Sequence, residues 1–198
     1  MEGLEDVEVT RRGMPVPRIL PLDRDDWDPP AIEALGRLVE RERVDNLFTT
    51  LARHPALLKR WLVFGYHMLF GSTLDERLRE LVILRMAHHK KCEYEFAQHV
   101  LVARNVGVLS AKIDAVVART DDVFTPLELA ALSAVDDLVQ DDVVSDETWE
   151  RLCAELNEQQ TMDLVFTIGG YNLVAWVLNS FGVQLDPHLQ QPHWAANP

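Results

Sequence analysis

The stretch from Glu158 to Ser180 constrains the fold of this chain more than any other part of the sequence. Apolar side chains cover every side of the helix that this stretch predicts; they are Met162, Leu164, Val165, Phe166, Ile168, Leu173, Val174, Trp176, Val177 and Leu178. A helix that is apolar all round has to be surrounded by other elements. We therefore expect it at the centre of the fold or at a subunit interface.

The rest of the chain also repeats its apolar residues at helical spacing. The predicted helices cover residues 31–43, 46–53, 56–70, 73–91, 92–105, 111–118, 125–140 and 145–156. Two capping boxes support these limits, Thr73 with Glu76 and Thr125 with Glu128, because the paired side chains satisfy free amides at a helix start. No stretch alternates as a strand does. The sequence predicts an all-α, single-domain bundle of about eight helices.

The chain divides into three parts. Residues 1–30 are polar and rich in proline, which predicts an extended N-terminal arm that wraps the body or a partner subunit. Residues 31–186 form the helical domain, and residues 187–198 form a C-terminal tail. This division predicts a single hydrophobic core with two irregular ends.

Composition excludes several classes of protein. The formal net charge of −13 argues against nucleic acid or an anionic membrane as the main partner. No apolar run reaches the roughly 18 residues of a membrane span, and the acidic N-terminus lacks the layout of a signal peptide. Cys92 and Cys153 are too few and too distant for a disulfide framework. We expect a cytoplasmic protein whose partner is a small-molecule substrate.

Functional groups are concentrated between Glu80 and His99. Cys92, Glu95 and His99 are spaced i, i+3 and i+7, so a helix places them on one face, and Glu80 begins a stripe that leads toward it. The flanking residues are apolar, which predicts that part of this polar stripe is buried. Buried ionisable groups are paired or shifted in pKa, and such places are candidate functional sites.

We expect four catalytic residues: Glu80, Cys92, Glu95 and His99. Glu95 and His99 are four residues apart and can hydrogen-bond, which would make the imidazole an oriented base. Glu80 would meet Cys92 across a break near residues 90–91. Two carboxyl groups in one pocket cannot both ionise cheaply, so one should have a raised pKa and act as an acid.

Other polar residues have weaker claims. His88 could complete a metal set with Cys92, Glu95 and His99, but no HExxH or paired CxxC pattern is present, so we expect neither metal nor cofactor. Tyr94 is expected to serve packing. Further candidates for the pocket wall are His67, Tyr171, Asn172 and Asn179, and the acidic run over residues 136–142 is expected to be a solvated face.

The order of these residues resembles a known signature. Glu80, eleven residues, Cys92, two residues, Glu95, three residues and His99 is similar to the Glu-x11-Cys-x2-Cys-x3-His pattern of the carboxymuconolactone decarboxylase and alkylhydroperoxidase D superfamily. The resemblance implies an all-helical bundle assembled as dimers, trimers or hexamers. The second Cys of the peroxidase pattern is Glu95 in this chain, so the dithiol cycle of the peroxidases lacks one of its thiols.

The resemblance implies two enzymatic functions, and a non-enzymatic function stands beside them as a third hypothesis. The first is a cofactor-free acid/base enzyme of the decarboxylase or lyase type, acting on a small carboxylated lactone or related carbonyl compound. The alternative is a thiol peroxidase in which Cys92 becomes a sulfenic acid and an external thiol resolves it. The third is an oligomeric scaffold whose pocket admits no substrate.

Overall fold

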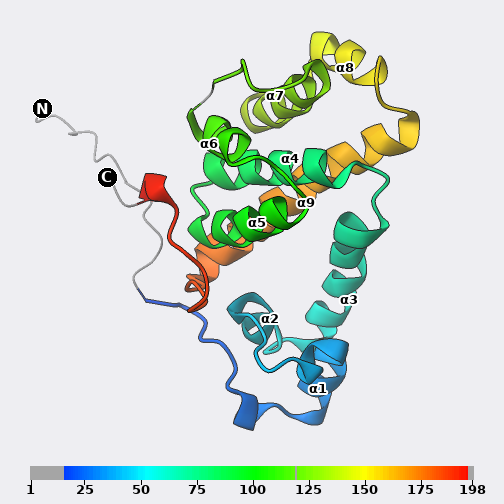
Figure 1. The fold of residues 1–198 in the computed structure, drawn as a ribbon. Helices are drawn as coiled ribbons and strands as arrows, with labels where there is room; N and C mark the ends of the chain where they lie inside the picture. The colour runs from blue at the N-terminus through cyan, green and yellow to red at the C-terminus, as the bar shows by residue number, and fades with distance from the viewer. Residues whose placement is uncertain (1–15, 119, 196–198) are drawn as a thin grey trace, which may run out of the picture.

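The computed structural model describes residues 16–118 and 120–195, and these residues contain nine α-helices and no strand (Figure 1). The all-α prediction is therefore confirmed. The α-helices are α1 Pro29–Leu35, α2 Asn46–Leu51, α3 Pro55–Tyr66, α4 Glu76–His89, α5 Glu93–Asn105, α6 Ser110–Ala118, α7 Pro126–Gln140, α8 Asp146–Cys153 and α9 Glu158–Phe181. Short turns of other helix types are η1 Arg24–Asp26, η2 Gly36–Glu40, η3 His67–Gly71 and η4 His193–Ala195.

Helix α4 is the centre of the bundle, with α5, α6, α7 and α9 packed around it (Figure 1). Every residue from 78 to 87 on this helix is buried, although three of them are charged. Since a helix surrounded on all sides has no solvent face, its charged residues must find partners inside the protein. The position of α4 thus explains why Arg79, Glu80 and Arg85 are paired.

Helix α9 buries one side and leaves another open. Its residues Leu164, Ile168 and Ala175 are buried, whereas Phe166 and Trp176 are exposed. Contrary to the sequence-based expectation, α9 is long and apolar enough to cross a bilayer by length and composition, a test that the core helix of a soluble protein also passes. Its contacts with α4, α5, α7 and α8 explain the apolar character of its buried side as packing within this fold.

A tight turn joins α4 to α5 beside the expected site. Helix α4 ends at His89, and Lys91 adopts a left-handed conformation with φ of 51°. The Cys92 amide then donates to the Ala87 carbonyl at 2.9 Å, and Cys92 becomes the N-cap of α5. The predicted break near residues 90–91 is confirmed, and it brings the start of α5 back against α4.

Two helix starts show where local signals succeed and fail. The capping box of Thr125 and Glu128 opens α7 as predicted. The predicted box of Thr73 and Glu76 is wrong: Asp75 caps α4 through the amides of residues 77 and 78. The Thr73 amide and hydroxyl instead donate to Asp163 of α9, at 2.6 and 2.8 Å.

The described parts of both terminal segments pack on the helical body. The amides of Arg18 and Ile19 donate to the Phe181 carbonyl, and in the C-terminal segment Asp186 and Leu189 are buried. Trp194 packs edge-on against Phe96, with 5.5 Å between ring centroids. The predicted arm over residues 1–15 and the end of the tail over residues 196–198 lie outside the described residues.

The acidic run over residues 136–142, which begins in the last turns of α7, is not simply a solvated face. Asp136 accepts hydrogen bonds from Arg85 at 2.7 and 2.8 Å and is bonded to His89 at 2.5 Å. Partial burial alone would raise the pKa of Asp136, but these hydrogen bonds outweigh burial and hold the pKa well below its usual range. Asp136 therefore ties α7 to the last turns of α4, which corrects the prediction.

Candidate active site

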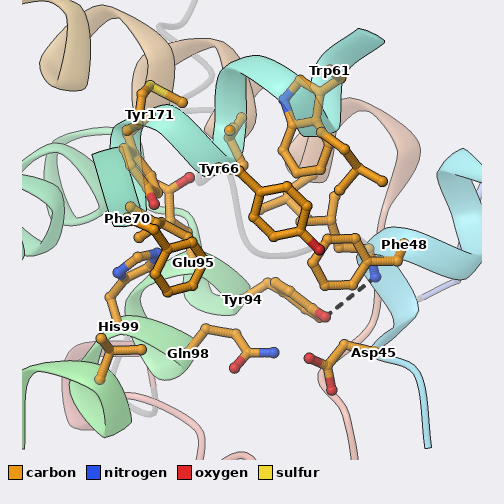
Figure 2. A pocket seen from close by; sticks show the side chains of 18 of the residues that line it. Asp45, Phe48, Trp61, Tyr66, Phe70, Tyr94, Glu95, Gln98, His99 and Tyr171 are labelled. Atoms are coloured by element: carbon orange, nitrogen blue, oxygen red, sulfur yellow. Dashed lines mark hydrogen bonds between the residues drawn. The ribbon is translucent and has the colours of Figure 1, made fainter. Parts of the chain in front are cut away.

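A cavity of about 360 Å³ lies where the first helices meet α5 and α9 (Figure 2). Its wall is mostly apolar and includes the rings of Phe48, Trp61, Tyr66, Phe70 and Tyr171. A few polar groups interrupt this wall, which is the usual composition of a small-molecule site. The volume suits a compound of one or two rings.

Helix α5 supplies the polar part of the wall through two adjacent stripes. Tyr94 and Gln98 form one stripe, and Glu95 and His99 form the other, each pair four residues apart. Successive residues on a helix differ by about 100° in direction, so the stripes face different parts of the cavity. Figure 2 shows Glu95 and His99 at one end, near Tyr171, and Tyr94 and Gln98 toward the other.

His99 is held by Glu80 and not by Glu95. Its Nδ1 lies 2.6 Å from Glu80 Oε2, and Arg79 Nε donates to Glu80 Oε1 at 3.2 Å. All three residues are buried, and Arg79 and His99 line the cavity. The carboxylate fixes the imidazole so that Nδ1 carries the proton and Nε2 is the basic nitrogen. The predicted Glu95–His99 hydrogen bond is therefore wrong, while the expected carboxylate–imidazole pair is present with another partner.

Arg79 adds a cation to the same end of the cavity. Its two terminal nitrogens make no hydrogen bond to a described residue, since the only bond of the guanidinium is the one from Nε to Glu80. Nothing in the sequence placed this side chain inside the pocket. The sequence signal that could have indicated Arg79 as a cavity residue is its place directly before Glu80, the acid of the expected site.

Glu95 is a buried carboxyl group without a partner. Only 2 % of the residue is exposed, and neither of its oxygens has a hydrogen-bond partner among the described residues. Burial raises the pKa of Glu95 well above its usual value. Burial without a partner therefore favours the protonated, uncharged form of Glu95, as the sequence predicted for one of the two carboxyl groups.

Cys92 lies close to this cluster but does not line the cavity. The residue is 1 % exposed and packs among Ala97, Val174 and Leu178. Burial, followed by the neighbouring Glu95 carboxyl, raises the pKa of the Cys92 thiol, and the amides at the start of α5 offset only part of this. A thiol in this state is not a ready nucleophile.

Tyr171 completes the inner end of the cavity. Its ring packs edge-on against His99, with 4.8 Å between the ring centroids. Burial raises the pKa of its hydroxyl well above the usual range, and so do the nearby carboxyl groups of Glu80 and Glu95. Tyr171 therefore remains a neutral phenol beside the imidazole, which the sequence raised only as a candidate.

The other sequence-based candidates lie elsewhere. His67 is exposed and bonded to Asp163, Asn179 donates to the Lys90 carbonyl, and none of these residues lines the cavity. His88 packs against Trp194 and does not line the cavity. Within residues 16–118 and 120–195, no group of three His, Cys, Asp or Glu side chains could hold a metal ion.

Comparison with known sequences gives one family match. Residues 55–137 match the sequence model of the carboxymuconolactone decarboxylase family. This range contains Arg79, Glu80, Cys92, Glu95 and His99, whereas α9 and the cavity-lining residues Asp45 and Phe48 lie outside it. Among curated proteins, none matches the chain in sequence.

Several solved structures share the fold. An uncharacterized peroxidase-related protein from Silicibacter sp. TM1040 has a TM-score of 0.70 at 15% identity, over 93% of this chain and 96% of that one. The alkylhydroperoxidase AhpD core protein from Ralstonia eutropha JMP134 has a TM-score of 0.68 at 19% identity, over 88% and 92%. The debrominase Bmp8 has a TM-score of 0.69 at 16% identity, over 85% and 92%. These similarities confirm the helical architecture.

Proposed function

We propose that this chain, a member of the carboxymuconolactone decarboxylase and alkylhydroperoxidase D superfamily, is a cofactor-free acid/base enzyme of the decarboxylase type. Its substrate would be a small carboxylated lactone or a related carbonyl compound. The observation that carries the proposal is the pairing, at one cavity wall, of a neutral acid with an oriented base. Glu95 is the acid, and His99 held by Glu80 is the base.

The charges at the inner end suit a substrate with one negative charge. Glu80 is bonded to both Arg79 and His99, and Glu95 is uncharged, so these groups present no excess negative charge to a ligand. The terminal nitrogens of Arg79 are available for an anionic oxygen. A guanidinium is a strong donor to carboxylate and enolate oxygens, particularly where water is excluded.

The reaction that fits these groups is loss of CO2 followed by protonation of carbon. The bond between the carboxylate carbon and its neighbour breaks, CO2 leaves, and the bonding electron pair passes into the adjacent carbonyl to give an enolate. Arg79 stabilises the enolate oxygen, and Glu95 delivers its proton to the carbon. His99 Nε2 then relays a proton from solvent to the Glu95 carboxylate, which restores the starting state.

A thiol peroxidase is the alternative, and the names of the peroxidase-related structural neighbours favour it. The state of Cys92 counts against it in this chain, because the thiol is buried, has a raised pKa and does not line the cavity. Peroxide reduction needs an accessible thiolate. We therefore retain the peroxidase as the second candidate only.

A panel of small carboxylated lactones, assayed for CO2 release, tests the proposal together with hydroperoxide reduction. We expect decarboxylation by the unchanged protein, a loss of at least 100-fold in kcat for Glu95→Gln and His99→Ala, and nearly full activity for Cys92→Ser. Glu93→Gln on the same helix is the matched control. Hydroperoxide reduction that depends on Cys92, with no decarboxylation, would establish the alternative.

A further inference from the structure

The end of the cavity opposite the acid/base cluster contains a second set of polar groups. Asp45, Gln98 and the Tyr94 hydroxyl face this part of the cavity, with Phe48 beside them (Figure 2). The mechanism proposed above uses none of them. They lie where a substituent of a bound ring would point if the ring's carboxylate were held near Arg79.

The backbone that carries Asp45 is held firmly on one side by Arg24. The Arg24 guanidinium donates to the carbonyls of Val39 at 2.6 Å, Arg41 at 3.1 Å and Glu42 at 3.2 Å. These hydrogen bonds hold the segment between η2 and α2 in one backbone conformation. A segment fixed in this way can present a side chain in a defined direction.

The same segment is held on its other side by the C-terminal part of the chain. The Asn46 amide donates to Asp186 Oδ1 at 3.1 Å, and the Leu47 amide donates to the Tyr94 hydroxyl at 3.3 Å. The Tyr94 hydroxyl in turn donates to Asp186 Oδ2 at 2.6 Å. Tyr94 thus does more than pack, and its neighbours Asp186 and Asn46 are satisfied without any contribution from Asp45.

Asp45 itself is left unbonded within this fixed frame. It is the N-cap residue of α2, where an Asp side chain normally accepts a hydrogen bond from the first turn, yet it caps no amide. Among the described residues its carboxylate also makes no ion pair, not even with Arg41, the exposed cation that lines the same cavity. Gln98, beside the Tyr94 hydroxyl, faces the same space.

We infer that Asp45, with Gln98, is the specificity-determining pair of the site and selects cyclic substrates carrying a hydrogen-bond donor opposite the reacting carboxylate. The inference rests on the proposed function for the position of the carboxylate. A carboxylate accepts hydrogen bonds and donates none, so the substituent must be a hydroxyl or an amino group. A substituent that only accepts can pair with the Gln98 amide but leaves Asp45 without a donor, which is the costly case.

Para-substituted benzoates are suitable probes, since each carries one carboxylate on a ring that fits the cavity. Benzoate itself, 4-hydroxybenzoate, 4-(aminomethyl)benzoate and 4-methoxybenzoate would be titrated calorimetrically into the unchanged protein. The same titrations would follow with Asp45→Ala, Asp45→Asn and the control Asp122→Ala, an exposed Asp before α7. Thermal melting of each variant verifies that the fold is kept.

We expect 4-hydroxybenzoate or 4-(aminomethyl)benzoate to bind at least tenfold more tightly than 4-methoxybenzoate, in line with a hydrogen bond to a charged acceptor. Asp45→Ala should abolish this preference, whereas the control Asp122→Ala should keep it. If Asp45→Asn keeps the preference, the selected donor is a hydroxyl; if it loses a preference for the aminomethyl compound, the donor is a cation.

Equal affinities for the hydroxy and methoxy compounds, with no gain for the aminomethyl compound, would overturn the inference, as would a preference that survives Asp45→Ala. The variant Arg79→Lys tests the proposed function separately. It keeps the positive charge beside Glu80 but loses the forked geometry of the guanidinium. Benzoate binding that is unaffected by Arg79→Lys would contradict the carboxylate position. Absence of binding by all four compounds would overturn both.

Discussion

Replacing Glu95 with Gln should stabilise this protein at neutral pH, although it removes a residue of the proposed active site. Burial raises the pKa of the folded carboxyl, so Glu95 remains protonated in the folded state where the unfolded chain has already ionised. The unfolded state then binds fewer protons than the folded state, and the free energy of unfolding falls as pH rises. Gln has nearly the same shape and does not ionise, so the variant escapes this loss.

The magnitude follows from proton linkage. Above the ordinary Glu pKa of about 4.3, the free energy of unfolding should decline by about 1.4 kcal/mol per pH unit for as long as folded Glu95 stays protonated. Because other groups contribute equally to both proteins, the difference between the variant and the unchanged protein isolates this term. Between pH 5 and pH 6 the difference should grow by about 1.4 kcal/mol in favour of Glu95→Gln.

Urea denaturation at half-unit steps from pH 5 to pH 7, followed by circular dichroism, measures this difference. Glu93→Gln provides the matched control, because Glu93 lies at the partly exposed start of the same helix. The control should track the unchanged protein at every pH. Parallel stability curves for Glu95→Gln and the unchanged protein would refute the conclusion that Glu95 is protonated.

Three further predictions concern other parts of the molecule. Asp136→Asn should lower the free energy of unfolding by about 2 kcal/mol at pH 7, as measured by urea denaturation, because the buried Arg85 guanidinium then lacks its carboxylate partner. The pKa of Asp136 is lowered in the folded state, so the stability that its carboxylate contributes is lost as pH falls through this lowered pKa. The difference between the variant and the unchanged protein should therefore vanish in strong acid. Thiol titration of the folded protein should detect Cys153 at once and Cys92 only after denaturation, so Cys153→Ser should remove the fast reaction. Gly170→Ala should lower stability by about 1–3 kcal/mol in thermal melting, because the added methyl group would overlap a methionine sulfur of η3.

Features determined by neighbours in the chain could be predicted from the sequence. The break near Lys91 and the capping box at Thr125 depend on residues within one or two turns, and both are confirmed. The Thr73 capping box does not form because the Thr73 amide and hydroxyl donate to Asp163, a residue distant in sequence. Local capping rules cannot anticipate a stronger acceptor brought in by another helix.

The candidate site was predictable in its residues and less so in its pairing. Helical spacing offered Glu95 as the partner of His99, but the bundle brings Glu80 within 2.6 Å of the imidazole and leaves Glu95 unbonded. The motif also grouped Cys92 with the pocket, whereas its N-cap position turns the thiol into the packing between α5 and α9. These differences arise from the angle between helices, which spacing alone does not encode.

The hydrogen bonds that join Tyr94, Asp186 and Asn46 couple the outer wall of the cavity to a segment near the other end of the chain. The C-terminal segment around Asp186 lies between α9 and η4 and is not part of any helix, so its detachment should require less energy than global unfolding. Amide hydrogens of Asn46 and Leu47 should accordingly exchange with solvent together, and sooner than those of α4. Ligand entry and release could then proceed through a brief local opening while the bundle stays intact.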